Sequence, residues 1–177
     1  MRNGVLASVA ILTSVIFVAC SQSQATTEAK VIRISDGDTV VVEKLFTHQR
    51  EKIRVWGIDT PEKFTSEKLY REAKKCHTTP ERIRYLGKLA SKHAHSYLSE
   101  GEIVEVEKLG KGHYGRVIGK IILPNGWDYG YRMVEDGYAC VYWKSTSEEY
   151  IKAMEEAKEN HRGLWEVDYE LMKCLCY

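Results

Sequence analysis

The sequence predicts an α+β fold that is mainly a small β-barrel of five strands, with about three helices around it. Two observations lead to this prediction. Runs rich in β-branched residues recur five times between residues 31 and 123. Residues with helical spacing fall between the third and fourth of these runs and after the fifth. Five short strands interrupted in this way indicate a five-stranded OB-fold barrel.

The first three strands are expected close together. Val31 to Ile34 alternates weakly between apolar and polar residues, and a turn follows at residues 35–38. Residues 39–45 are rich in β-branched side chains, and residues 52–58 continue the pattern up to Pro61. Such closely connected strands suggest a β-meander.

A helix is expected after these strands. Thr78 and Glu81 have the spacing of a capping box, with Pro80 near the first turn. Apolar residues then recur at three- and four-residue intervals and form one buried stripe, which consists of Ile83, Leu86, Ala90, Ala94 and Tyr97.

Two more strands complete the predicted barrel, at residues 102–109 and 116–123. The first alternates apolar residues with glutamates, and the second ends at the Pro-Asn-Gly turn of residues 124–126. The pattern therefore supplies the fourth and fifth strands.

Helices and a brief last strand are expected in the remaining chain. Asp128 is placed to cap a short helix that ends at Gly137, and residues 138–143 predict the strand. A final helix runs from about Thr146 to Gly163, because Thr146 begins a second capping-box spacing.

Composition indicates one soluble globular domain. The chain has 177 residues, of which 44% are hydrophobic and 29% are charged, with a net charge of +1. Residues 44–120 hold 17 Lys and Arg against 10 Asp and Glu, whereas residues 144–177 hold 5 against 8. A basic middle and an acidic tail fit a protein with one face that meets phosphates, although the charges alone favour the simpler explanation, a solvated helix face.

The N-terminal segment is expected to be a targeting signal. Residues 1–19 contain a short apolar stretch that is too short for a comfortable membrane span, and residues 17–20 (Phe-Val-Ala-Cys) resemble a bacterial lipobox. We expect a signal peptide at 1–19, lipidation of Cys20, a flexible linker to residue 29 and a folded domain over residues 30–177. The protein would then be exported and held at the membrane by its lipid anchor, or secreted if ordinary signal cleavage replaces lipidation.

Four cysteines remain in the expected exported chain. Cys76 and Cys140 are far from Cys174 and Cys176, and a bond between the last two would be strained across one residue. Two pairings therefore stay open, and each joins Cys76 and Cys140 to the C-terminal pair. A zinc site that uses Cys76, its neighbour His77 and the tail cysteines Cys174 and Cys176 is the alternative, but the spacing matches no standard zinc pattern.

Three short motifs carry the functional signal. They are Asp36-Gly37-Asp38-Thr39, the segment from Arg54 to Glu62 that ends in Asp59-Thr60-Pro61-Glu62, and Tyr114-Gly115-Arg116. Each alone has an ordinary structural explanation as a turn, a helix start or a strand start. Together, in this order, they resemble the staphylococcal nuclease (thermonuclease) family, and residues 163–165 (Gly-Leu-Trp) look like its terminal anchor. The resemblance covers roughly residues 31–165, and the stretch from Lys63 to Arg82 is longer than in the type member.

The resemblance implies a metal site. It assigns the carboxylates of Asp38 and Asp59 and the backbone carbonyl of Thr60 as ligands, while Asp36 is expected to serve the turn. Oxygen donors suit Ca²⁺ or Mg²⁺ rather than zinc, and the family uses calcium. Ca²⁺ is therefore the expected cofactor.

The resemblance also implies a hydrolytic reaction on DNA and RNA that leaves 3′-phosphate ends. Glu62 would orient or deprotonate the attacking water, and Arg54 and Arg116 would clamp the phosphate with paired hydrogen bonds. Tyr114 would contact a neighbouring phosphate, and Trp143 would stack on a base. No obligate protein partner is evident.

A non-catalytic surface lipoprotein, in which an OB-fold binds nucleic acid or protein without cutting it, is the alternative. Degenerate members of the family lose acidic or arginine positions. This chain retains all of them, which are Asp38, Arg54, Asp59, Glu62 and Arg116. The sequence therefore favours catalysis.

Overall fold

The computed structural model describes residues 26–144 and 147–177. The predicted signal peptide, the lipidation site Cys20, the first part of the linker and the predicted helix cap Thr146 lie outside the described residues. The predictions for these positions are therefore untested by the structure.

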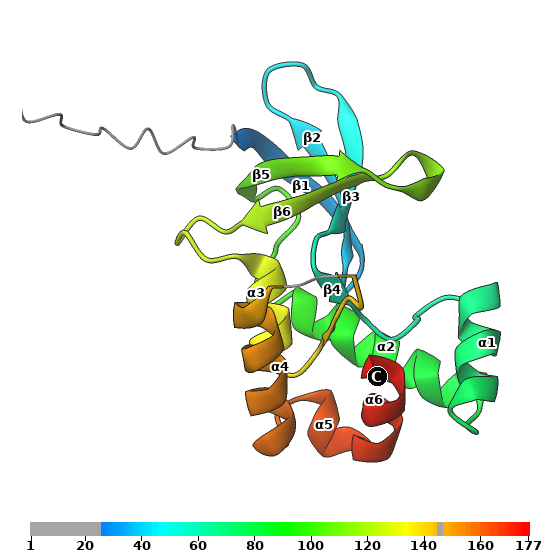
Figure 1. Cartoon of the computed structure of the whole chain (residues 1–177). Helices are drawn as coiled ribbons and strands as arrows, with labels where there is room; N and C mark the ends of the chain where they lie inside the picture. Colours follow the sequence, from blue (N-terminus) through cyan, green and yellow to red (C-terminus); the bar gives the residue numbers. More distant parts are fainter. Residues whose placement is uncertain (1–25, 145–146) are drawn as a thin grey trace, which may run out of the picture.

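Five strands close into a barrel, as the sequence predicts (Figure 1). They are β1 (Thr26–Asp36), β2 (Thr39–Lys44), β3 (Arg50–Val55), β5 (Ile103–Lys111) and β6 (Val117–Ile122). Their order around the barrel is β1-β2-β3-β6-β5, and β3 pairs with β6 in parallel while the other neighbours are antiparallel. The first three strands form the expected meander.

The interior of the barrel is made by alternate residues of these strands. Because side chains alternate across a strand, one face of each strand points inward. The inward side chains are almost completely buried, and they include Val31, Val40, Val42, Ile53, Val55, Val104, Val106 and Ile121.

The first strand begins earlier than the sequence predicts. Thr26 pairs with Glu107 of β5, and Ala29 pairs with Lys44 of β2 and is buried. Residues 26–29 therefore belong to the barrel, although their composition is typical of a linker. Pairing on both sides overrides their weak strand propensity.

Within the described part of the chain, six helices gather at one end of the barrel (Figure 1). They are α1 (Glu67–Lys75), α2 (Pro80–Ala94), α3 (Tyr129–Glu135), α4 (Glu148–Glu159), α5 (Leu164–Val167) and α6 (Tyr169–Cys176). The sequence predicts α2, α3 and α4 with ends that differ by a few residues. The expectation of about three helices missed α1, α5 and α6, which are short and place few residues in the core.

Side-chain caps mark where two of these helices begin, and one of them differs from the prediction. The Asp128 carboxylate accepts hydrogen bonds from the backbone N–H groups of Gly130 and Tyr131 and caps α3. Thr79, one residue after the predicted Thr78, accepts from the Arg82 N–H and caps α2. The apolar stripe of α2 is buried at Ile83, Leu86, Ala90 and Ala94, as predicted. Tyr97, its last predicted member, follows the end of the helix and is only partly buried.

A second, very small sheet lies beside the barrel. β4 (Ile58–Asp59) pairs with β7 (Cys140–Val141), and Asp59 lies opposite Cys140. Within the predicted strand 138–143, the strand β7 contains only Cys140 and Val141. The 3₁₀ turn η1 (His113–Gly115) precedes β6.

The C-terminal region is fastened to the rest of the molecule by two disulfides. Cys76 bonds to Cys174, and Cys140 bonds to Cys176. This is one of the two pairings that the sequence leaves open, and because it uses all four thiols it removes the zinc alternative. Trp165 of the predicted terminal anchor is fully buried.

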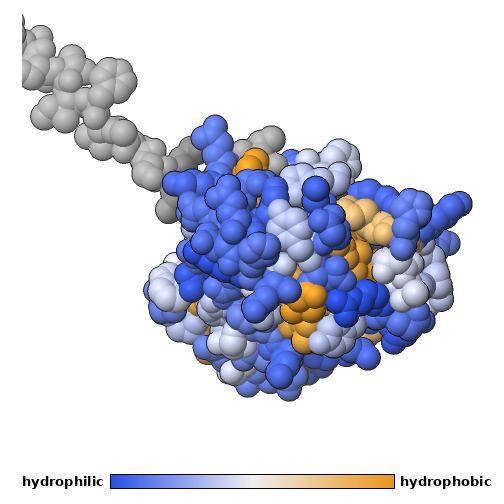
Figure 2. Space-filling model, turned by 90° about the horizontal axis from the view of Figure 1, so that it is seen from below, coloured by the Kyte–Doolittle hydropathy of each residue, from blue (hydrophilic) through white to orange (hydrophobic). Residues whose placement is uncertain are grey.

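The helical end presents a mainly hydrophilic surface, with hydrophobic residues in small patches (Figure 2). Within residues 26–144 and 147–177, no helix is both long and apolar enough to cross a membrane.

Candidate active site

The turn between β1 and β2 places the first acidic residue. The Gly37 carbonyl accepts a hydrogen bond from the buried Tyr129 hydroxyl at 2.7 Å, which holds the turn against α3. Gly37 also lies against Thr60, because a Cβ added there would be 2.7 Å from the Thr60 Cγ2 atom. Asp36 accepts from the Asp38 N–H at 3.2 Å, which is the turn role expected for it.

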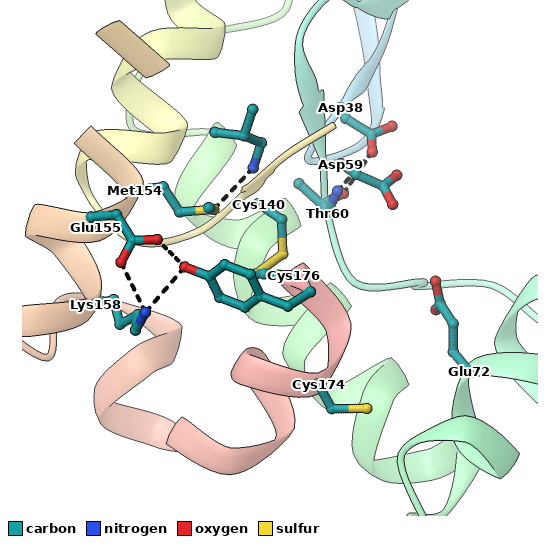
Figure 3. Close-up of a disulfide and its surroundings, with 12 residues drawn as sticks. Asp38, Asp59, Thr60, Glu72, Cys140, Met154, Glu155, Lys158, Cys174 and Cys176 are labelled. Carbon is teal, nitrogen blue, oxygen red and sulfur yellow. Dashed lines mark hydrogen bonds and ion pairs between the residues drawn. A yellow bond between two sulfur atoms is a disulfide. The ribbon is translucent and has the colours of Figure 1, made fainter. Parts of the chain in front are cut away.

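Asp38 is joined directly to Thr60 (Figure 3). The Asp38 Oδ2 atom accepts hydrogen bonds from the Thr60 N–H at 2.9 Å and from the Thr60 hydroxyl at 3.1 Å. The Thr39 hydroxyl donates to the other oxygen, Oδ1, at 3.0 Å. These contacts bring together two segments that are 22 residues apart in the sequence.

Arg54 bridges the two predicted carboxylate ligands. Its Nη1 atom lies 2.8 Å from Asp38 Oδ2, and its Nη2 atom lies 2.7 Å from Asp59 Oδ1. Asp38 and Arg54 face each other because β2 and β3 are antiparallel, with Arg54 opposite Thr39. The guanidinium is thus fixed by both carboxylates.

Glu62 joins this cluster through a lysine. The Lys68 Nζ atom lies 2.8 Å and 3.0 Å from the two Asp59 oxygens, and 3.0 Å from Glu62 Oε1. The hydroxyl of Ser66, the N-cap of α1, donates to Glu62 Oε2 at 3.2 Å. Glu62 therefore lies at the same site as Asp59, as the motif spacing predicts.

The cluster shifts the pKa values of its carboxyl groups in opposite directions. Burial raises the pKa of Asp36 to about 7, and the neighbouring Asp38 adds to the rise. Burial also acts to raise the pKa of Asp38, but the Arg54 guanidinium and the Thr60 N–H outweigh it and lower this pKa. The pKa of Asp59 is raised, because burial and Asp38 outweigh Lys68 and Arg54. Of the two expected metal ligands, Asp38 and Asp59, Asp38 consequently keeps its negative charge more firmly.

Arg116 is placed near this site by the strand register but is not joined to it. Arg54 pairs with Ile118 across the parallel β3–β6 ladder, so Arg116 precedes the strand next to Arg54. Its Nε atom donates to the His113 carbonyl at 3.2 Å. Among the described residues, no hydrogen bond or ion pair connects Arg116 to Asp38, Asp59 or Glu62.

The two predicted substrate contacts lie on the surface. Tyr114 is 96% exposed and has a φ of 59°, a left-handed conformation that is uncommon for a bulky residue. Strained backbone of this kind gathers at functional sites. Trp143 is 79% exposed, with the Lys144 ammonium 4.6 Å from its ring centroid. Both rings are accessible, but contact with a substrate remains a prediction.

Sequence reasoning missed three residues that shape the site. Lys68 and Glu72 come from α1, which the sequence did not predict, and the Lys68 Nζ atom lies 3.5 Å from Glu72 Oε1. Lys63 donates to the Ser35 carbonyl and to the Ser91 hydroxyl, so it fastens the residue after Glu62 to β1 and α2. The spacing of Lys68 and Glu72, four residues apart, was the available signal, but it also fits a solvated helix face.

The donor set fits a hard divalent cation. The described residues contain no group of three or more His, Cys, Asp and Glu side chains arranged to hold a metal ion. The ligand set implied by the resemblance has only two carboxylates, from Asp38 and Asp59, together with the Thr60 carbonyl. Asp38 Oδ1 accepts a hydrogen bond from the Thr39 hydroxyl, whereas both Asp59 oxygens accept from the Lys68 ammonium. These oxygens suit Ca²⁺ or Mg²⁺, provided that the Lys68 ammonium moves away from Asp59.

The barrel and this acidic–arginine cluster define a nuclease-family domain. A model of the family described as "Staphylococcal nuclease homologue" matches residues 52–167, about two thirds of the chain. The chain belongs to this family.

Named relatives agree with this placement. The chain is 30% identical over 154 residues to "Endonuclease YhcR" of Bacillus subtilis. This match covers 82% of this chain but only 12% of that protein. It is 27% identical over 137 residues to an "Uncharacterized endonuclease" of Escherichia coli, over 77% of this chain and 75% of that protein. It is 26% identical over 141 residues to the "Thermonuclease" of Staphylococcus intermedius, over 77% of this chain and 74% of that protein.

Proposed function

We propose that the chain is a calcium-dependent nuclease that hydrolyses phosphodiester bonds of DNA and RNA and leaves 3′-phosphate ends. The observation that carries the proposal is the bridge of Arg54 between Asp38 and Asp59, with Glu62 at the same cluster. The family and the endonucleases among the relatives support it.

Positively charged side chains would stabilise the negative charge that develops on the phosphate during the reaction. Attack of water adds negative charge to a phosphate that already carries one. The Arg54 guanidinium, held by two carboxylates, would donate paired hydrogen bonds to phosphate oxygens. Arg116 would add a second guanidinium once its side chain turns from the His113 carbonyl. Tyr114 and Trp143 would contact the flanking nucleotides.

Glu62 would act on the water. A carboxylate within hydrogen-bond reach orients the water and accepts its proton. Asp38, Asp59 and the Thr60 carbonyl would hold the cation, which supplies positive charge for the phosphate and its entering oxygen. With so few protein ligands, water and substrate oxygens would have to complete the coordination shell, and calcium tolerates such an irregular shell.

Digestion of plasmid DNA, single-stranded DNA and RNA tests this function. Activity should disappear after chelation and return with Ca²⁺. Full activity in chelator-treated protein would refute the metal assignment of Asp38 and Asp59. Binding of nucleic acid without any cleavage, with Ca²⁺ present, would favour a non-catalytic OB-fold module.

We also propose that the protein is anchored to the cell envelope through lipidated Cys20. The basis is the lipobox-like sequence at residues 17–20, which precedes the described domain. The protein should partition with membranes, and Cys20→Ser should release or misprocess it, because a lipoprotein N-terminus supplies the several acyl chains that stable anchoring needs. Wild-type protein that is wholly soluble and unlipidated after export would refute the anchor.

A further inference from the structure

The most unusual feature of the site is a lysine at its centre. The Lys68 ammonium contacts both oxygens of Asp59 at 2.8 Å and 3.0 Å and Glu62 Oε1 at 3.0 Å, and it lies 3.5 Å from Glu72 Oε1. Its side chain is only 30% exposed. One ammonium thus neutralises carboxylates from β4, from the segment after it and from α1.

The helix that carries Lys68 is fixed at both ends. At its start, the Ser66 hydroxyl caps the Leu69 N–H and also donates to Glu62. At its end, the C-cap residue Cys76 is bonded to Cys174. The position of α1 is therefore set by covalent and polar contacts, and a change of partner by Lys68 needs rotation only about the bonds of its four-carbon side chain.

Lys68 and a divalent cation require the same oxygens. Calcium binds carboxylate oxygens at about 2.3–2.6 Å, closer than an ammonium approaches them. Both oxygens of Asp59 already hold Lys68. Two cations on one carboxylate, a few ångströms apart in a partly buried site, repel each other.

Glu72 offers a second position for the ammonium. It lies one helical turn after Lys68 on α1, and its Oε2 atom is buried without a hydrogen-bond partner among the described residues. Figure 3 shows Glu72 on α1, on the side of the molecule where Asp38 and Asp59 lie. A buried oxygen of this kind is costly to leave unpaired, so an ammonium that moves towards it is stabilised.

We propose that Lys68 is an internal counter-cation that is exchanged for the divalent metal. In the metal-free protein it holds Asp59 and Glu62 together, and on metal binding it moves to Glu72, which frees Asp59 as a ligand and Glu62 for water. Lys68 is thus a positioning residue that sets the metal affinity. The inference rests on the proposed metal site.

Calorimetric titration of the full-length chain in detergent with CaCl₂ tests the exchange. Lys68→Gln should bind Ca²⁺ at least about fivefold more tightly than the wild type, the low end of typical coupling between two ligands. Lys68→Gln should also melt at a lower temperature than the wild type in chelator and gain more from added Ca²⁺. Lys74→Gln, an exposed change on the same helix, controls for a general loss of positive charge and should leave the affinity near that of the wild type.

A double-mutant cycle separates exchange from simple electrostatics. Glu72→Gln should weaken Ca²⁺ binding in the wild type, because Lys68 loses its second position. The same change should have little effect in the Lys68→Gln background, where no ammonium needs that position. Equal effects of Glu72→Gln in both backgrounds would overturn the exchange, as would unchanged or weaker Ca²⁺ binding by Lys68→Gln. A wild-type protein that binds no Ca²⁺ would instead refute the proposed metal site itself.

Discussion

At the scale of single residues, the site is a set of charges held by one another. Arg54 is fixed by Asp38 and Asp59, and Lys68 links Asp59 to Glu62. The acidic residues could be predicted because they lie within short motifs of fixed spacing. Lys68 could not, since its role depends on where α1 lies and not on its neighbours in the sequence.

Glu62 allows a test that separates catalysis from binding. Glu62→Gln keeps the size of the side chain but removes the carboxylate that would accept the proton of water. We expect kcat to fall by about 100-fold or more, the usual contribution of a general base, with a much smaller change in substrate binding. Single-turnover cleavage and a separate binding measurement check this. Turnover near that of the wild type would show that the assignment of the active site is wrong.

Asp36 should make stability depend on pH in an uncommon direction. Its pKa rises from 3.8 to about 7 on folding because of burial and Asp38. Between these values the unfolded chain has lost the proton that the folded chain keeps, so stability falls as pH rises through this window. Above it, the wild type bears the full cost of an ionised Asp36.

Asp36→Asn should therefore relieve a cost that grows with pH. Asparagine keeps the oxygen that accepts the Asp38 N–H but does not titrate. In metal-free protein, we compare the free energy of unfolding of the variant with that of the wild type. This difference should favour the variant more at about pH 7.5 than at about pH 4.5, by an amount on the order of 2–4 kcal/mol. Urea unfolding in chelator at both values measures this. A stability difference that does not change with pH would contradict the raised pKa.

At the scale of elements, α2 supports the segment that carries Glu62. A Cβ added to Gly87 would lie 2.6 Å from the Pro61 carbonyl oxygen and 2.7 Å from the Glu62 backbone. The backbone of residues 61–62 thus rests directly on the helix. The sequence predicted α2 from its apolar stripe, but this contact is between distant segments and leaves no local pattern.

Gly87→Ala should displace Glu62 even though alanine favours a helix. The clash with backbone atoms should cost about 1–3 kcal/mol, against roughly 1 kcal/mol gained in helix propensity. We expect little net gain or a loss in stability, and a clear fall in kcat. Gly110→Ala is the matched control, since a Cβ there meets no atom within 4 Å. Full activity of Gly87→Ala would show that residues 61–62 move aside without consequence.

Local composition explains why the sequence did not predict α1. In α1 only Leu69 and Ala73 are buried among nine residues, and most of the others are charged. Such a stretch is typical of a solvated surface, and its place is set by contacts with α2 and by Cys76. The early start of β1 has a similar cause, because pairing with β2 and β5 outweighs local composition.

At the scale of the whole molecule, the C-terminal helix braces the site from two sides. Cys76, which ends α1, and Cys140, which lies opposite Asp59, are both bonded to α6. Figure 3 shows the Cys140–Cys176 bond beside the strand that carries Asp59. The sequence predicted that the tail would be attached to Cys76 and Cys140, and only the fold could choose between the two pairings.

Removing each disulfide should lower stability unequally. The bonds separate residues 98 and 36 positions apart, and a longer closed loop restricts the unfolded chain more. Cys76→Ser/Cys174→Ser and Cys140→Ser/Cys176→Ser should each lose about 2–5 kcal/mol, with the first about 1 kcal/mol worse. Urea unfolding of both variants without metal measures the order. A larger loss for the second variant would mean that local contacts at β7 outweigh chain entropy.

The same tail bonds also impose an order in time. A polypeptide grows from its N-terminus, so Cys76 and Cys140 emerge long before Cys174 and Cys176. During that interval neither of the two early thiols has its native partner. The brace of the site can therefore be completed only after Cys176 has emerged.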